Sequence, residues 1–168
     1  SLTVAPGAIL KFALQQGLAI NGTLTARGTA ALPITLTSIR DDAAGGDTNN
    51  DAAGTSPAPG NWGVLNFGDG SVGTIDYATL RYGGFSNSGV LYASGYSVPT
   101  LVSTNVSLTK NTFNGVQLLG GTLSRPSTTL PYQQGFAYYV SGTITVPSGS
   151  SLTVAPGAIL KFALQQGL

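Results

Sequence analysis

The chain has 168 residues, of which 42% are hydrophobic and only 8% are charged, and its formal net charge is +1. A charge this close to zero gives no field that would gather nucleic acid, and no run of about 20 apolar residues predicts a membrane span. Cys and His are absent, which excludes disulfides, thiol nucleophiles and His-based triads. We therefore expect neither a nucleic-acid partner nor membrane insertion.

Short strands are predicted from the first residues onward. The runs SLTV and AILKF stand on either side of a turn at Pro6–Gly7. Residues 23–25 and 34–37 alternate apolar and hydroxyl side chains, the period-two pattern of a strand with one buried face. Helix signals are nearly absent, so we expect an all-β fold. Further turn signals divide the chain at Asn21–Gly22, Gly83–Gly84, Asn114–Gly115 and Gly120–Gly121.

Residues 40–61 interrupt this pattern. The segment RDDAAGGDTNNDAAGTSPAPGN has no strand period and holds four of the six acidic residues. We predict one long loop inserted between Ser38 and Trp62. Trp62 is expected to pack over the base of the loop, with its ring buried and its indole N–H bonded to a carbonyl.

The spacing of the strands selects one architecture. Residues 106–109 and 143–146 repeat the alternation, and from Thr143 onward strands start every seven to ten residues, too closely for a β-sandwich. We predict a right-handed parallel β-helix (a β-solenoid) with about six coils per 150 residues, which would advance roughly 29 Å. Residues expected to face inward are Leu2, Val4, Leu10, Phe12, Leu24, Ile34, Leu36, Ile144 and Val146, and those expected to face outward are Thr3, Lys11, Thr23, Thr25, Thr35 and Thr143.

The sequence repeats itself. Residues 151–168 are identical to residues 1–18. Fixed-period identity is typical of tandem repeat proteins, so we interpret residues 1–150 as one complete unit and residues 151–168 as the start of the next. The alternative is that the second copy is an added terminal cap.

The order of the pieces resembles a known group. The run SLTVAPGAILKF, followed by LAINGTLTARGTAALPITLTS, NWGVLNF and IDYATLRYGG, is similar to bacterial secreted right-handed parallel β-helix repeat proteins. The resemblance covers residues 1–84 and 136–168 closely, and residues 85–135 loosely through LVSTNVSLTKNTFNGVQL. It implies a secreted or surface location and long multi-repeat chains. It implies no single activity, because the fold carries lyases, adhesins and inert stalks alike.

The inserted loop contains a candidate calcium site. Asp47, Asn49 and Asp51 follow the pattern D-x-N-x-D, in which oxygen ligands at alternate positions can surround a hard cation. A closing carboxylate would come from Asp41 or Asp42, which places Ca²⁺ in the 41–54 loop.

The match to an EF-hand loop is partial. Ala52 and Ala58 stand where that loop has its glycine and its bidentate glutamate. The alternative is an acidic turn whose Asp and Asn side chains bond their own backbone.

No catalytic residue is predicted. Asp69 and Asp76 are the only acids outside the loop, and a glycosidase needs two facing carboxylates. The distant alternative is a calcium-dependent polysaccharide lyase that uses the loop carboxylates with Arg40 or Arg81. Arg81 is expected instead to cover apolar surface with its stem.

Pairs of threonines raise a surface-binding hypothesis. The pairs Thr23/Thr25, Thr35/Thr37 and Thr143/Thr145 would suit an ice- or crystal-binding face if they formed one column. The simpler interpretation is that threonine is favoured on strands by its β-branch.

The array interpretation predicts the function. We expect a non-enzymatic module of a long extracellular or cell-surface filament, stalk or adhesin, and carbohydrate is a further candidate partner. The principal partner is the chain itself, in a covalent array or by head-to-tail stacking of exposed strand edges. The residues expected at those edges are Ser1, Leu2, Val4, Leu10, Phe12, Ser151, Leu152, Val154, Leu160 and Phe162.

Overall fold

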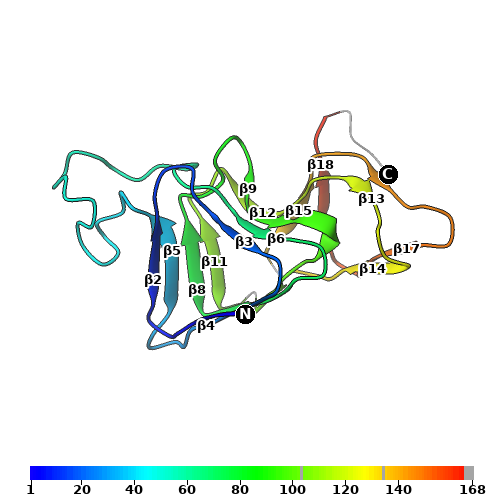
Figure 1. Cartoon of the computed structure of the whole chain (residues 1–168), viewed down its shortest axis with the longest axis horizontal. Coiled ribbons are helices and arrows are strands. Elements are labelled where there is room, and N and C mark those ends of the chain that lie inside the picture. The colour runs from blue at the N-terminus through cyan, green and yellow to red at the C-terminus, as the bar shows by residue number, and fades with distance from the viewer. Residues whose placement is uncertain (103, 134, 165–168) are drawn as a thin grey trace.

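Short strands separated by turns wind into six successive turns of a parallel β-solenoid (Figure 1). The computed structural model describes residues 1–102, 104–133 and 135–164. All strand pairs among these residues are parallel, which confirms the predicted fold class. In this part of the chain the only helical element is the 3₁₀ turn Ser94–Tyr96. No described helix is long and apolar enough to cross a membrane.

Three sheets form the sides of the coil, and their strands follow one another in the order A, B, C through the first four turns. Sheet A contains β1 (Leu2–Val4), β4 (Thr23–Arg27), β7 (Val72–Asp76) and β10 (Thr100–Leu101). Sheet B contains β2 (Ile9–Phe12), β5 (Ile34–Ser38), β8 (Ala78–Arg81) and β11 (Val106–Thr109). Sheet C contains β3 (Leu18–Ile20), β6 (Leu65–Phe67), β9 (Gly89–Ala93), β12 (Phe113–Leu118), β15 (Ala137–Val140) and β18 (Leu160–Phe162).

The last two turns add two short strand pairs to sheet C. Strand β13 (Gly121–Thr122) pairs with β16 (Ile144–Thr145), and β14 (Ser127–Leu130) pairs with β17 (Ser151–Val154). Sheets A and B end at β10 and β11, whereas sheet C continues through all six turns. Sheet C is therefore the continuous side of the described solenoid.

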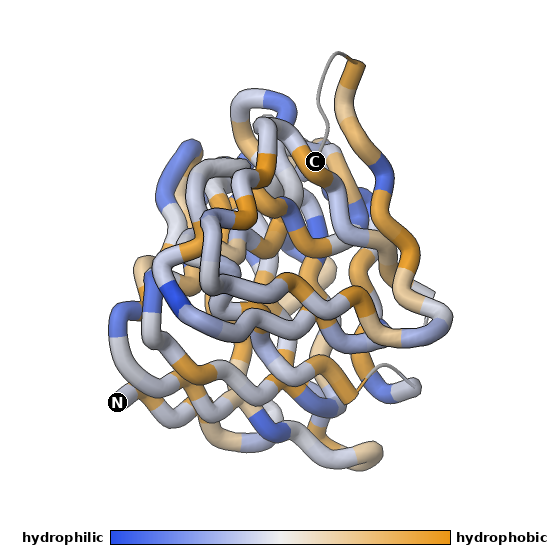
Figure 2. Tube along the Cα trace, turned by 90° about the vertical axis from the view of Figure 1, so that its right-hand side faces the viewer, coloured by the Kyte–Doolittle hydropathy of each residue, from blue (hydrophilic) through white to orange (hydrophobic). Residues whose placement is uncertain are grey.

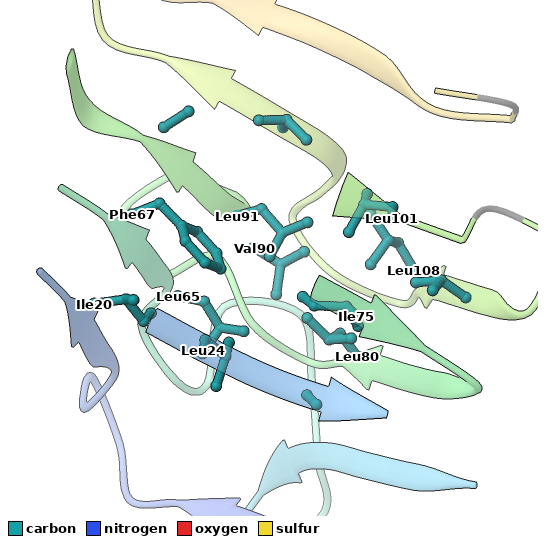
Figure 3. Close-up of a cluster of buried hydrophobic side chains, with 14 of the residues drawn as sticks. Ile20, Leu24, Leu65, Phe67, Ile75, Leu80, Val90, Leu91, Leu101 and Leu108 are labelled. Atoms are coloured by element: carbon teal, nitrogen blue, oxygen red, sulfur yellow. The ribbon is translucent and has the colours of Figure 1, made fainter. Parts of the chain in front are cut away.

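Inward side chains stack in columns because the register is maintained from turn to turn. Sheet B aligns Leu10, Leu36, Leu80 and Leu108. Sheet C aligns one column through every turn, consisting of Leu18, Leu65, Leu91, Val116, Tyr138 and Leu160. The columns meet in a single core, part of which Figure 3 shows. Burial raises the pKa of Tyr138 to about 12, so its hydroxyl stays protonated and donates to the carbonyl of Pro131.

The inward and outward predictions hold at most positions. Val4, Leu24, Ile34, Leu36 and Ile144 are buried, and Leu10 and Phe12 are partly buried against the core.

Two residues predicted to face inward, Leu2 and Val146, are exposed, and the inward prediction is wrong only at Val146. Leu2 has the inward register of buried Leu24, but it lies in the first turn, where no earlier coil covers it. Val146 is exposed because β16 ends at Thr145 and the chain then turns away.

One predicted turn lies inside a strand. Asn114–Gly115 belongs to β12, where the register against β9 shifts between Phe113 and Val116. A Cβ built on Gly115 would come 2.4 Å from the carbonyl oxygen of Ala137. The glycine is therefore required for close approach of two strands, a role that the dipeptide signal cannot distinguish from a turn.

Over residues 1–14 and 151–164, the part of the repeat that is described in both copies, the two identical segments have the same local structure. In each, two strands flank a Pro–Gly turn in which the glycine has a positive φ, 79° at Gly7 and 82° at Gly157. A turn hydrogen bond accompanies both glycines, from Ala8 N–H to the Ala5 carbonyl in the first copy and from Ala158 N–H to the Ala155 carbonyl in the second.

The same segments occupy different positions in the coil. The first copy supplies β1 to sheet A and β2 to sheet B, whereas the second supplies β17 to the pair with β14 and β18 to sheet C. The described residues of 1–150 form 16 strands, β1 to β16, and 16 is not a multiple of three. The second copy therefore enters the coil one strand position later than the first.

Candidate metal centre

The inserted loop leaves sheet B after β5 and returns to sheet C before β6, as predicted (Figure 1). No strand forms between Ile39 and Val64. The base of the loop is fixed by backbone bonds to the first turn of the solenoid. Gln15 N–H donates to the Asn61 carbonyl at 2.9 Å, and Gly63 N–H donates to the Gln16 carbonyl at 2.7 Å.

Trp62 anchors the loop where it returns. Its side chain is fully buried, its ring stacks on Phe12 with centroids 4.6 Å apart, and its indole N–H donates to the Arg81 carbonyl at 2.7 Å. These contacts confirm the predicted position of Trp62. They join the loop base to strands of sheet B, so the loop is attached to a rigid surface.

Three carboxylates of the loop meet. Asp42, Asp47 and Asp51 each place one carboxylate oxygen within 4.8 Å of the others. Oxygens on opposite sides of a calcium ion lie about 5 Å apart, because each Ca–O distance is 2.3–2.6 Å. Of the two residues considered for closing the site, the structure brings Asp42 to the cluster.

Several oxygens around this cluster have no hydrogen-bond partner. The Oδ1 atoms of Asp42, Asn49 and Asp51 are each shielded from solvent and unpaired. Both ion pairs found among the described residues lie elsewhere, at Arg81–Asp41 and Arg125–Asp69. A shielded carboxylate oxygen without a donor or a cation is unfavourable. These oxygens are the groups that a hard cation would contact at this position.

The loop backbone holds these side chains in place. Asp47 accepts the N–H of Ala52 at 2.8 Å and that of Asp51 at 3.3 Å. These bonds, above all the one from Ala52, lower the pKa of Asp47, which is otherwise exposed. The Thr55 hydroxyl donates to Asp51 Oδ2 at 2.5 Å and accepts from the Asn49 amide at 3.2 Å. The side chain-to-backbone bonds expected of an acidic turn are thus present. They leave the Oδ1 atoms of Asp42, Asn49 and Asp51 unpaired.

Asp41 lies in a different environment. It is buried, and its Oδ2 accepts the Thr37 hydroxyl at 2.5 Å and the Arg81 guanidinium at 2.7 Å. The structure therefore places Asp41 in a buried ion pair at the root of the loop, outside the cluster of Asp42, Asp47 and Asp51. Arg81, for which the favoured expectation was that its stem covers apolar surface, is the partner in this pair.

Lys11 was expected only to face outward, and the structure gives it a further contact. Its ammonium group donates to the Gly46 carbonyl at 2.5 Å and to the Thr48 hydroxyl at 3.0 Å. These bonds tie the far part of the loop to β2. In the sequence, Lys11 is only a lysine in a predicted strand of the coil before the inserted loop. That observation is too weak to predict its partners in the loop.

The other candidate residues are dispersed. Asp69 pairs with Arg125, and Asp76 accepts the Asn105 amide at 3.0 Å. The three threonine pairs lie in three separate strands, β4, β5 and the region of β16, and Thr37 is fully buried. Sheet A does align Thr25 in one column with three threonines outside these pairs, Thr3, Thr74 and Thr100.

Comparison with known proteins adds no relative. No family model matches the chain, and neither a curated protein nor a solved structure matches it significantly.

Proposed function

We propose that this chain is a non-enzymatic structural module of a long extracellular filament, stalk or adhesin, of the kind seen in bacterial secreted β-helix repeat proteins. The observation that carries the proposal is the exact copy of residues 1–18 at 151–168, combined with a fold that extends by adding coils. A structural protein gains length and stiffness by repeating one unit, because every unit then has the same structural role.

Stiffness in such a module comes from the backbone. Among the described residues, sheet C bonds each coil to the next through six turns, whereas sheets A and B do so through the first four. The core columns add side-chain contacts along the same axis. With 16 strands per unit at three per turn, a unit of 150 residues advances roughly 26 Å, slightly less than the sequence alone predicts.

A chain of tandem units tests this proposal. Proteins with one, two and three copies of residues 1–150, each closed by residues 151–168, are expected to form rods. Their maximum dimension in small-angle X-ray scattering should increase by roughly 26 Å per unit. The matched control inserts a flexible Gly/Ser linker between units. If the proteins with and without the linker scatter alike, the units are independent beads and the proposed rigid module is wrong.

The proposed module includes a calcium site in its loop. Asp42, Asp47 and Asp51 would supply carboxylate oxygens, and Asn49 would supply its unpaired amide oxygen. The exposed position of Asp47 and the lack of a bidentate glutamate favour weak binding, with a Kd of about 10⁻⁴–10⁻³ M as in extracellular modules.

Calcium titration is expected to give one binding event that stabilises the loop and leaves the solenoid unchanged. Asp51→Asn should lower the affinity at least about tenfold, because it removes one ligand charge. Calcium should also slow tryptic cleavage after Arg40, at the start of the loop, whereas the far-ultraviolet circular dichroism stays constant. Isothermal titration calorimetry and timed proteolysis measure the two effects.

Asp69→Asn is the matched control, because Asp69 is an exposed aspartate with its own partner, Arg125. It should bind calcium like the unmodified chain. Absence of binding heat, together with identical proteolysis with calcium and with chelator, would reduce the loop to an acidic turn.

A further inference from the structure

The two identical segments use opposite edges. Strands β1 and β2 pair with strands of the next turn, β4 and β5. Strands β17 and β18 pair with strands of the preceding turn, β14 and β15. The structure therefore records both neighbours of one sequence, each on a different copy.

The exposure of side chains agrees with this division. Val4 is buried beneath the second turn, whereas its counterpart Val154 is 42% exposed. Phe12 stacks on Trp62, whereas its counterpart Phe162 is 39% exposed. Figure 2 views the end of the stack that bears the second copy, and apolar positions lie along its trace. Each copy has only one of the two neighbouring coils that this sequence can pair with.

We propose that the edge of β14 and β15 is an acceptor site for residues 1–12 of a second copy of this chain, and that residues 151–162 act as a built-in cap on that site. The inference rests on the proposed repeat-module function and specifies its partner and its contact.

The expected contact can be stated residue by residue. β17 on β14 pairs Leu152 with Thr128 and Val154 with Leu130. β18 on β15 pairs Leu160 with Tyr138 and Phe162 with Val140. In an incoming copy the corresponding residues are Leu2, Val4, Leu10 and Phe12, whose other edges keep their own pairing with β4 and β5.

The cap and the incoming strands make the same contacts. Both present the same sequence to the same acceptor edge, so replacing one by the other creates no new type of contact. The cap is tethered, however, and a short tether gives an effective concentration in the millimolar range. The 168-residue chain should therefore remain monomeric at micromolar concentration, and weakening the cap should release assembly.

The junction also has a defined offset. Because the second copy enters one strand position later, sheet C of one copy should be continued by sheet B of the next, as β18 continues it here. Head-to-tail contacts of this kind do not close on themselves, so the assembly should grow into filaments.

The test weakens the cap by Leu152→Asp with Leu160→Asp in the 168-residue chain. These two apolar side chains pack against the core, so buried carboxylates should detach the segment. Sedimentation velocity is expected to show monomers for the unmodified chain and concentration-dependent oligomers for the variant. A soluble peptide with the sequence of residues 151–168 should return the variant to monomers, and a scrambled peptide should not.

The other copy supplies the matched control. Leu2→Asp makes the same change in the donor strand, where the side chain is 40% exposed. Alone it should leave the chain monomeric, and added to the cap variant it should abolish assembly. A cap variant that keeps its circular dichroism and stays monomeric overturns the proposal, as does assembly that Leu2→Asp leaves unchanged.

A second measurement covers loss of folding in the cap variant. Labelled peptide at millimolar concentration, which matches the effective concentration of the tethered cap, should displace the cap from a fraction of the unmodified chains, and fluorescence anisotropy at equilibrium measures the bound peptide. Failure to bind overturns the proposal. Rod formation by tandem units does not depend on either result, so the two proposals can fail separately.

Discussion

Replacing Trp62 by alanine is expected to lower the free energy of unfolding by about 4 kcal/mol, in the range for large-to-small changes at buried aromatic residues. The ring is fully buried and stacks on Phe12 at an interplanar angle of 16°. Its removal also leaves the Arg81 carbonyl without the indole donor. Three losses therefore coincide at one residue: buried area, a ring contact and a hydrogen bond.

Chemical denaturation followed by circular dichroism measures this loss. Trp62→Phe is the matched control, because it keeps a ring against Phe12 but removes the indole N–H. It should lose about 1–2 kcal/mol, the cost of one unmade bond and a smaller ring. If both variants lose the same amount, the hydrogen bond dominates and the ring contributes little, contrary to the geometry.

The solenoid could be predicted because its signals are local. Alternating runs such as residues 34–37 state which face of a strand is buried, and their close spacing excludes long connections. The insertion was predicted for the same reason, since residues 40–61 lack any period. Trp62 at the end of a polar loop is a large apolar side chain with a polar atom, so its burial and its carbonyl partner followed.

Partners across the coil could not be predicted. The contact of Lys11 with Gly46 and the pairing of Arg81 with Asp41 join residues 35 and 40 positions apart. These contacts depend on the register between neighbouring coils. The sequence pattern predicts which residues form strands but not how those strands align. Asp41 and Asp42 are adjacent and chemically identical, and only the path of the loop decides which one joins the cluster.

The position of the second copy in the coil depends on the number of strands that precede it. Identical sequence predicts identical local structure, and residues 1–14 and 151–164 form it. Their sheet positions differ because 16 described strands precede the second copy, and this number includes short strands such as β10 and β13. Strands of two residues leave almost no period in a sequence, so the total, and with it the offset, requires the structure.

The second large effect is expected at Asp41, where Asp41→Asn should lower the free energy of unfolding by about 3 kcal/mol. Asp41 is 2% exposed and the Arg81 side chain is 26% exposed. Loss of the carboxylate charge leaves a partly buried guanidinium without its counter-ion and weakens the bond from the buried Thr37 hydroxyl. Breaking one member of a buried pair costs more than the pair contributes as a whole.

A double-mutant cycle with Arg81→Met separates the pair from its surroundings. The double variant should be little less stable than Asp41→Asn alone, giving a coupling energy of about 2–3 kcal/mol. The exposed pair of Asp69 and Arg125, with the same 2.7 Å separation, provides the matched control. Asp69→Asn should cost less than about 1 kcal/mol, because solvent screens an exposed pair. Equal losses at Asp41 and Asp69 would mean that burial does not strengthen the first pair. A loss of stability confined to Asp41→Asn would show that the buried pair stabilises the start of the loop. The same change from aspartate to asparagine would then lower the free energy of unfolding only where the carboxylate is buried.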